Sequence, residues 1–171
     1  MAFITQGSTF YSFADYDDVA QIDSRLFQAN EGLTQDDVEA ALIRSTTKIL
    51  DLLRNTDWWK SFYISKEGFL NVIVEQAISV PALDPFYIRA RQGDFTDMTV
   101  YHTLSVYLLP RVADFGNPDS AERQKIGFYD EKFRKTFDEL INDGDWYDFD
   151  NSGTITAADK YPFPVNLRRA R

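Results

Sequence analysis

The 171-residue sequence contains no cysteine, which excludes a disulfide framework, a thiolate metal site and a cysteine nucleophile. Its single histidine, His102, has no evident catalytic partner, so we interpret it as a surface or core residue of a helix rather than a general base. The eight glycines are spread singly, without the pattern of a phosphate-binding loop, and the serines show no nucleophile elbow. We therefore expect that the protein is not an enzyme.

Long apolar runs and an excess of positive charge are also missing. No stretch approaches the roughly 18 apolar residues of a membrane span, and the opening MAFITQGSTFYSF lacks the pattern of a secretory signal. We expect a soluble protein made in the cytoplasm, without a membrane partner. The net charge of -9 disfavours tight non-specific binding to nucleic acid, which needs Lys and Arg. The same charge is compatible with lining a channel through which DNA slides.

Hydrophobic residues make up 44% of the chain and aromatic residues 15%, which is enough to build the core of one domain. The aromatic and turn-rich residues 1–30 predict an irregular leading segment with a short helix near Asp18–Ile22. We expect most of these aromatic side chains to pack on the core. The alternative is that they contact a partner.

Apolar spacing predicts the helices that follow. Thr34 is the expected N-cap of a long helix that ends near Asn55 or Thr56, and residues 57–62 continue it or form a short helix. Residues 69–80 are ambiguous between a strand and a buried helix. Asp84 and Pro85 are typical of a cap followed by a first-turn proline.

Two further long helices are expected, at about 94–112, where Pro110 should kink the last turn, and from Asp119 or Ser120 to about Asn142. The apolar face of the last helix consists of Ile126, Tyr129, Phe133, Phe137, Leu140 and Ile141. The fold class is therefore predicted to be mainly α, a helical bundle.

Residues 148–159, DFDNSGTITAAD, match the twelve-residue calcium loop of the EF-hand. Gly153 occupies the sixth position, where the chain turns sharply. The candidate ligands are Asp148, Asp150, Ser152, the carbonyl of Thr154, and Asp159, while Thr156 could hold a water. Oxygen ligands at these offsets suit a hard cation, so the loop predicts a structural Ca²⁺ or Mg²⁺ ion. The protein is not expected to require a cofactor.

Three features differ from a calcium sensor. The twelfth residue is Asp159 rather than a bidentate Glu, Pro162 and Pro164 curtail the exit helix, and no second loop is present. Asp143 and Asp145 add negative charge just upstream, and mutual repulsion of the carboxylates favours a bound cation. The alternative is an Asx-type turn without an ion.

Three stretches together resemble one protein family. They are DYDDVAQIDSRLFQANEGLTQDDVEAALIRSTTKILDLLR, YLLPRVADF and DWYDFDNSGTITAADK. They are similar to the head–tail connector proteins, also called adaptor or head-completion proteins, of tailed bacteriophages. The resemblance spans most of residues 14–160.

This resemblance implies a structural protein of the virion neck, made in the host cytoplasm. It implies a homo-oligomeric ring, typically of about twelve copies, that binds the portal protein and joins it to the next neck or tail component, a stopper or tail-completion protein. DNA would pass through the ring without sequence-specific binding.

A connector of this kind commonly extends a C-terminal arm into the portal. We therefore divide the chain into a helical domain, 1–159, and an extended arm, 160–171. The prolines favour an extended chain, and the basic end suits an acidic neighbour. The expected portal-binding residues are Tyr161, Phe163, Arg168, Arg169 and Arg171. The alternative is a frayed terminus.

Two other functions stay open from the sequence. One is a monomeric helical calcium-binding interaction module. The other is a metal-dependent hydrolase built on Asp148 and Asp150, for which no group that positions a nucleophile is evident.

Overall fold

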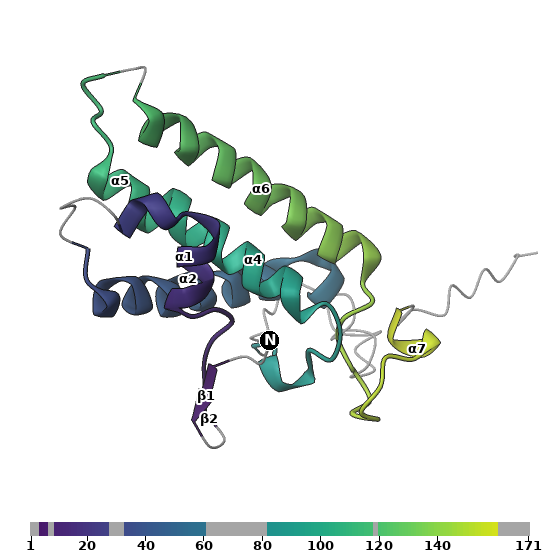
Figure 1. Cartoon of the computed structure of the whole chain (residues 1–171). Helices are drawn as coiled ribbons and strands as arrows, with labels where there is room; N and C mark the ends of the chain where they lie inside the picture. Colours follow the sequence, from purple (N-terminus) through teal and green to yellow (C-terminus); the bar gives the residue numbers. More distant parts are fainter. Residues whose placement is uncertain (1–3, 7–8, 28–32, 61–81, 118–119, 161–171) are drawn as a thin grey trace, which may run out of the picture.

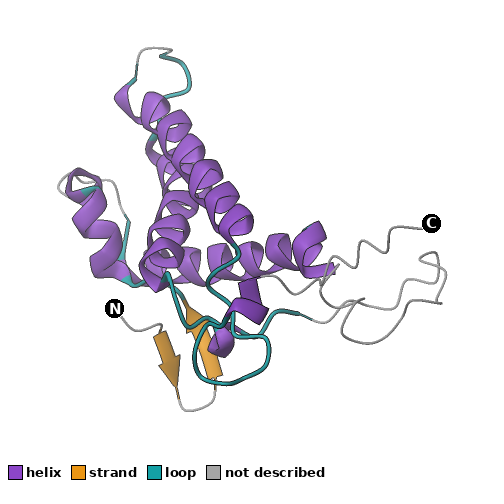
Figure 2. Ribbon diagram, turned by 90° about the vertical axis from the view of Figure 1, so that its right-hand side faces the viewer, coloured by secondary structure: helices purple, strands orange, loops and turns teal. Residues whose placement is uncertain are grey.

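The computed structural model describes residues 4–6, 9–27, 33–60, 82–117 and 120–160. Within them, long helices pack into a bundle, with a small β-hairpin at one side and a loop-rich segment beyond the last long helix (Figures 1 and 2). The predicted mainly α fold class is confirmed. The ambiguous segment 69–80 and the expected arm residues 161–171 lie outside the described residues.

The N-terminal residues form an antiparallel hairpin of strands β1 (Ile4–Gln6) and β2 (Thr9–Ser12). This segment is more regular than the sequence predicted, because its end is attached to the core. The Phe13 side chain is only 2% exposed, and the Ser12 hydroxyl lies 3.2 Å from the hydroxyl of Thr46. Packing of the leading aromatic residues on the core is thus confirmed for Phe13.

Helix α1 (Tyr16–Ile22) begins slightly earlier than predicted and is followed by a 3-10 helix, Ser24–Phe27. Asp15 and Asp18 form a capping box, in which each side chain accepts the backbone N–H of the other residue. These bonds satisfy N–H groups that have no partner within the helix, which fixes where α1 starts.

Helix α2 (Gln35–Asn55) has the predicted limits and the predicted cap. Thr34 accepts the N–H of Asp37, and Asp37 accepts the N–H of Thr34. A bend at Thr56 separates α2 from helical residues 57–60. The buried face of α2 consists of Val38, Ala41, Leu42, Ser45, Thr46, Ile49 and Leu53.

The predicted helix at 94–112 is confirmed as a continuous helical stretch with three parts. They are α4 (Gln92–Thr103), a π-helical turn (Leu104–Leu108) and α5 (Leu109–Val112). Residues of α4 pack against both α2 and α6 (Ala121–Asp143). α4 therefore lies between the other two long helices (Figure 1).

The π-helical turn explains how the helix accommodates Pro110. A proline inside an α-helix lacks the N–H and collides with the carbonyl four residues earlier, here that of Val106. In this helix the amide of Leu109 instead bonds to the carbonyl of Leu104, five residues before it. The expected disturbance at Pro110 thus takes the form of a widened turn.

Helix α6 runs antiparallel to α4 (Figure 1). The Ser120 side chain caps its start and the left-handed Gly144, with φ of 56°, follows its end. Tyr129 and Leu140 are its buried residues. The other members of the predicted apolar face, Ile126, Phe133, Phe137 and Ile141, are partly buried and pack on the core.

Within the described residues the core consists of two hydrophobic clusters, to which opposite ends of the α4–α5 stretch contribute. One includes Phe13, Leu53, Phe95, Leu140 and Trp146. The other includes Val19, Val38, Leu42, Leu104 and Leu108. The first cluster supports the predicted calcium loop.

Candidate functional site

The candidate site is the loop between α6 and the short helix α7 (Ala157–Lys160). Its start is attached to the bundle by backbone and side-chain bonds. The indole Nε1 of Trp146 donates to the carbonyl of Leu140 at 2.7 Å, and the Asp148 amide donates to the carbonyl of Tyr87 at 2.9 Å. Tyr147 also forms an isolated β-bridge with Ile88. The loop therefore leaves the bundle from a fixed position.

Ile88, the partner of Tyr147 in this bridge, directly follows a 3-10 helix, Pro85–Tyr87, and the cap-and-proline signal for that helix is confirmed. Asp84 accepts the amide N–H of Phe86 at 2.9 Å, and Pro85 occupies the first turn. The fixed φ of proline suits this position.

An aromatic layer lies beneath the loop. The ring centroids of Trp58 and Trp146 are 4.7 Å apart, those of Tyr147 and Phe149 are 4.8 Å apart, and Trp59 stacks on Phe149 at 6.0 Å. Aromatic pairs at such distances contribute about 0.5–1.5 kcal/mol beyond the area that they bury. The layer makes residues 146–149 part of the core rather than of a surface loop.

The loop brings three of the predicted ligand residues together. Asp148, Asp150 and Asp159 offer carboxylate oxygens that all lie within 4.8 Å of one another. Asp148 is 1% exposed and Asp159 is 2% exposed, whereas Asp150 faces solvent. Two negative groups are thus held inside the protein at the end of the aromatic layer.

Backbone N–H groups surround the two buried carboxylates. Asp148 accepts from Ser152 at 3.0 Å and from Gly153 at 2.8 Å. Asp159 accepts from Phe149 at 3.0 Å and from Thr156 at 2.7 Å. These bonds close the loop on itself and bring its first and twelfth positions together.

Two residues of the loop have left-handed backbone conformations. Asn151 has φ of 57° and Gly153 has φ of 86°. Glycine adopts such angles without strain, and Asn tolerates them better than most residues. The sixth-position glycine of the motif is therefore required by the backbone, as the sequence predicted.

The remaining predicted ligands lie beside each other. The Ser152 hydroxyl donates to the Thr154 carbonyl oxygen at 3.0 Å. Thr156, the residue that could hold a water, uses its hydroxyl to donate to Asp159 Oδ2 at 2.7 Å. That bond orients the carboxylate at the twelfth position.

The pKa of Asp148 reflects a competition between burial and hydrogen bonding. Burial of the carboxyl acts to raise the pKa, but the N–H groups of Gly153 and Ser152 stabilise the ionised form and hold the pKa below its ordinary value. The guanidinium Nε of Arg89 lies 3.6 Å from Asp148 Oδ2 and adds positive charge at the same place.

The upstream carboxylates Asp143 and Asp145 do not join this cluster, because a different arginine holds them. Arg91 Nη1 lies 2.6 Å from Asp143 and 3.7 Å from Asp145, and its Nε lies 2.6 Å from Asp94. Arg91 has φ of 57° and immediately precedes α4. It connects the start of α4 to the end of α6.

The donor set fits a hard divalent cation. Oxygens that share one Ca²⁺ ion at about 2.3–2.6 Å can be at most about 5 Å apart, and the three carboxylates satisfy this limit. Mg²⁺ binds at about 2.0–2.1 Å, so the same oxygens would have to approach one another further. The arrangement therefore suits Ca²⁺ better than Mg²⁺, and Asp148, Asp150 and Asp159 would hold the ion.

Arg89 and Arg91 are the site residues that sequence reasoning missed. Their carboxylate partners in and before the loop are far away in the sequence, and no spacing rule connects them. The β-bridge between Ile88 and Tyr147 brings the two segments together.

His102 is a core residue, in agreement with its interpretation from the sequence. Its Nδ1 lies 3.0 Å from the hydroxyl of Ser45, which is 0% exposed. A serine hydrogen-bonded to a histidine resembles part of a catalytic triad, but this pair is enclosed between α2 and α4. No substrate can reach the serine there.

The predicted arm residues Tyr161, Phe163, Arg168, Arg169 and Arg171 lie outside the described part of the chain. No helix in the described part is long and apolar enough to span a membrane. In comparisons with known proteins, no family model, no curated protein and no solved structure matches the chain.

Proposed function

We propose that this protein is a structural component of the neck of a tailed-phage virion. It forms a ring that joins the portal to the tail and continues the DNA channel. Its role is structural rather than enzymatic. Its partners are other copies of the chain, the portal protein and the next neck or tail component.

One observation carries this proposal: the three stretches that resemble connector proteins pack together. The first forms α1 and α2, the second runs from the end of the π-helical turn through α5, and the third forms the loop, α7 and part of the aromatic layer. Trp146 of the third stretch and Leu53 of the first belong to the same hydrophobic cluster. The residues that carry the resemblance therefore belong to one packed domain.

The calcium-type loop has a structural role in this proposal. It lies between α6 and the residues expected to form the arm, and the bonds of Asp148 and Asp159 fix its shape. A bound Ca²⁺ would neutralise the three carboxylates and stiffen the loop further. The loop would then set the direction in which the chain leaves the bundle.

The experiment that tests this function is the native mass of the chain mixed with the portal oligomer from the same source. We expect a gain of many copies, and we expect its loss when residues 160–171 are removed. Retained binding after truncation would move the contact to the helical body. No association would contradict the connector function.

A second candidate function, a monomeric calcium-binding interaction module, is favoured by the clustering of Asp148, Asp150 and Asp159. It predicts a melting temperature that rises with Ca²⁺ while the chain stays monomeric with and without the portal oligomer. The connector predicts association, whether or not Ca²⁺ changes the melting temperature.

A further inference from the structure

A partly apolar groove lies between the β-hairpin and α2. Its lining includes Ile4 and Tyr11 of the hairpin and Ile43 of α2, which are 40%, 40% and 41% exposed. The groove has a volume of about 340 Å³. A cavity of roughly 150 Å³ is enough to hold benzene, so this groove has room for an aromatic ring.

The rim of this groove is acidic. Asp15 and Glu39 are the charged residues among those that line it. An adjoining hollow, which shares Asp15, is lined by Asp17 and Asp18 of α1. No Lys or Arg of the described residues lines either hollow. The groove therefore favours an apolar group that carries a positive charge.

The outer face of α6 presents such a group. Phe128 is 54% exposed, and the ammonium of Lys132 lies over its ring, 5.5 Å from the ring centre. No described carboxylate forms an ion pair with Lys132. Aromatic side chains are enriched among the residues that anchor protein interfaces.

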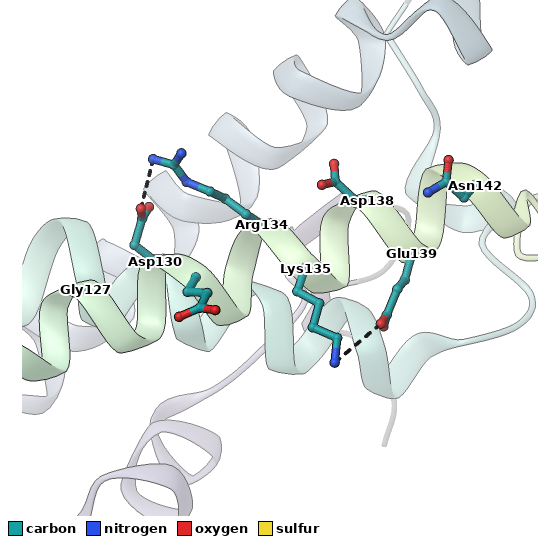
Figure 3. A pocket seen from close by; sticks show the side chains of 8 residues that line it. Gly127, Asp130, Arg134, Lys135, Asp138, Glu139 and Asn142 are labelled. Atoms are coloured by element: carbon teal, nitrogen blue, oxygen red, sulfur yellow. Dashed lines mark ion pairs between the residues drawn. The ribbon is translucent and has the colours of Figure 1, made fainter.

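The neighbouring cations of α6 differ from Lys132 because they already have partners. Arg134 pairs with Asp130 at 2.9 Å, and Lys135 pairs with Glu139 at 3.8 Å (Figure 3). Such pairs within one helix neutralise each other locally. Among these three cations, Lys132 is the one whose charge can pair with a carboxylate of another subunit.

The groove and this aromatic–cation pair lie on different sides of the molecule, because α2 and α6 flank α4 from different sides (Figure 1). One surface can therefore contact the other only in a second copy. Contacts between two different patches are heterologous, and they close into a ring when the rotation between copies permits.

We propose that Phe128 and Lys132 of one subunit dock into the groove beside Ile43 and Glu39 of the next. The phenyl ring enters the apolar part of the groove, and the ammonium lies at its acidic rim. This inference rests on the proposed ring function and identifies the surfaces that build the ring.

A charge exchange tests the contact through the native mass, measured alone and on the portal oligomer. Lys132→Glu and Glu39→Lys should each weaken association at least about tenfold, because each places like charges opposite one another. An equal mixture of the two variants should assemble again, since alternating copies restore opposite charges at every contact. Phe128→Ala should weaken association by roughly thirtyfold or more and should not be rescued.

Arg134→Glu and Asp51→Lys are the matched controls, because each inverts an exposed charge on the same two helices away from the proposed contact. Both should assemble as the wild type does. If the wild type assembles and the variants at Glu39, Lys132 and Phe128 do so equally well, the proposed interface is wrong, while the proposal of a ring is retained. If the wild type stays monomeric even with the portal oligomer, the ring fails, and the interface fails with it.

Discussion

At the scale of single residues, buried polar side chains determine which helix faces meet. The Ser45 hydroxyl of α2 accepts a hydrogen bond from Thr103 of α4 at 2.7 Å and contacts His102. The Thr96 hydroxyl donates to the carbonyl of Phe13 at 2.8 Å. A buried polar group that loses its partner costs about 1–3 kcal/mol, so a shift of α2 along α4 is penalised.

His102 makes the stability of the bundle depend on pH. Burial lowers its pKa and the nearby Lys48 adds to the effect, while Asp130 opposes it. As pH falls through the ordinary value of 6.5, the unfolded chain binds a proton and the folded chain does not, so stability is lost by up to about 1.4 kcal/mol per pH unit.

Denaturant unfolding at pH 7.5 and at pH 5.5 would measure this loss. In His102→Gln the part of the loss that belongs to this residue should disappear, and the losses due to carboxylates should remain. Equal pH dependence in the two proteins would contradict the assignment.

A substitution at Gly153 tests whether the backbone of the loop requires glycine at this position. Gly153→Ala should lower the free energy of unfolding by about 1 kcal/mol, because the residue has φ of 86°. Gly93→Ala is the matched control, since a Cβ at either position meets nothing within 4 Å and Gly93 has no positive φ. The control should be neutral or slightly stabilising. Equal changes in the free energy of unfolding for the two variants would show that the loop accommodates alanine at Gly153 without strain.

At the scale of elements, the helices were predictable and their irregularities were not. Caps and apolar spacing predicted α2 and α6 because both signals lie within a few residues of each other. The hairpin was missed because its strands are short and depend on contacts with α2. The π-helical turn was missed because Pro110 predicts a disturbance but not which hydrogen bonds replace the lost one.

The capping box of α2 is an element-scale feature with a direct test. Thr34→Ala should lower the free energy of unfolding by about 1 kcal/mol, because the Asp37 amide loses its acceptor. Thr47→Ala is the matched control in the same helix, since its hydroxyl only bonds back to the carbonyl of Ile43. A thermal or denaturant unfolding curve measures both. Equal losses would argue against the cap.

The candidate site was also predictable in part: the residues within the loop were predicted, but their distant partners were not. The positions of Asp148, Asp150 and Asp159 follow from spacing within one loop, and the structure brings their carboxylates together. The partners of the upstream acids could not be foreseen. Arg91 instead forms ion pairs with Asp143 and Asp145, and this depends on the β-bridge between Ile88 and Tyr147, which sequence spacing does not reveal.

At the scale of the whole molecule, the loop is coupled to the bundle through the cluster that contains Trp146 and Phe149. Ca²⁺ bound to the loop should therefore stabilise the entire domain. At a concentration a hundredfold above the dissociation constant, the gain should be about 2.7 kcal/mol. Asp148→Asn should abolish the rise in melting temperature. Asp138→Asn, at an exposed position of α6, should retain it. An unchanged melting temperature would favour the ion-free turn.

The loop and ring assembly can be tested together. Asp148→Ala combined with Asp150→Ala should reduce binding to the portal oligomer, because the chain beyond α7 loses its fixed direction. The Asp138→Asn protein again serves as the control, and native mass is the measurement. Wild-type assembly by the double variant would contradict this role of the loop.

α4 has seven buried residues, whereas the longer α6 has two. Separation of α6 from the bundle would therefore expose fewer fully buried side chains than separation of α4. Local openings occur first where least surface is buried. Backbone amides in the middle of α6 should exchange with deuterium before those in the middle of α4, so the domain should open from one side rather than unfold as a single unit.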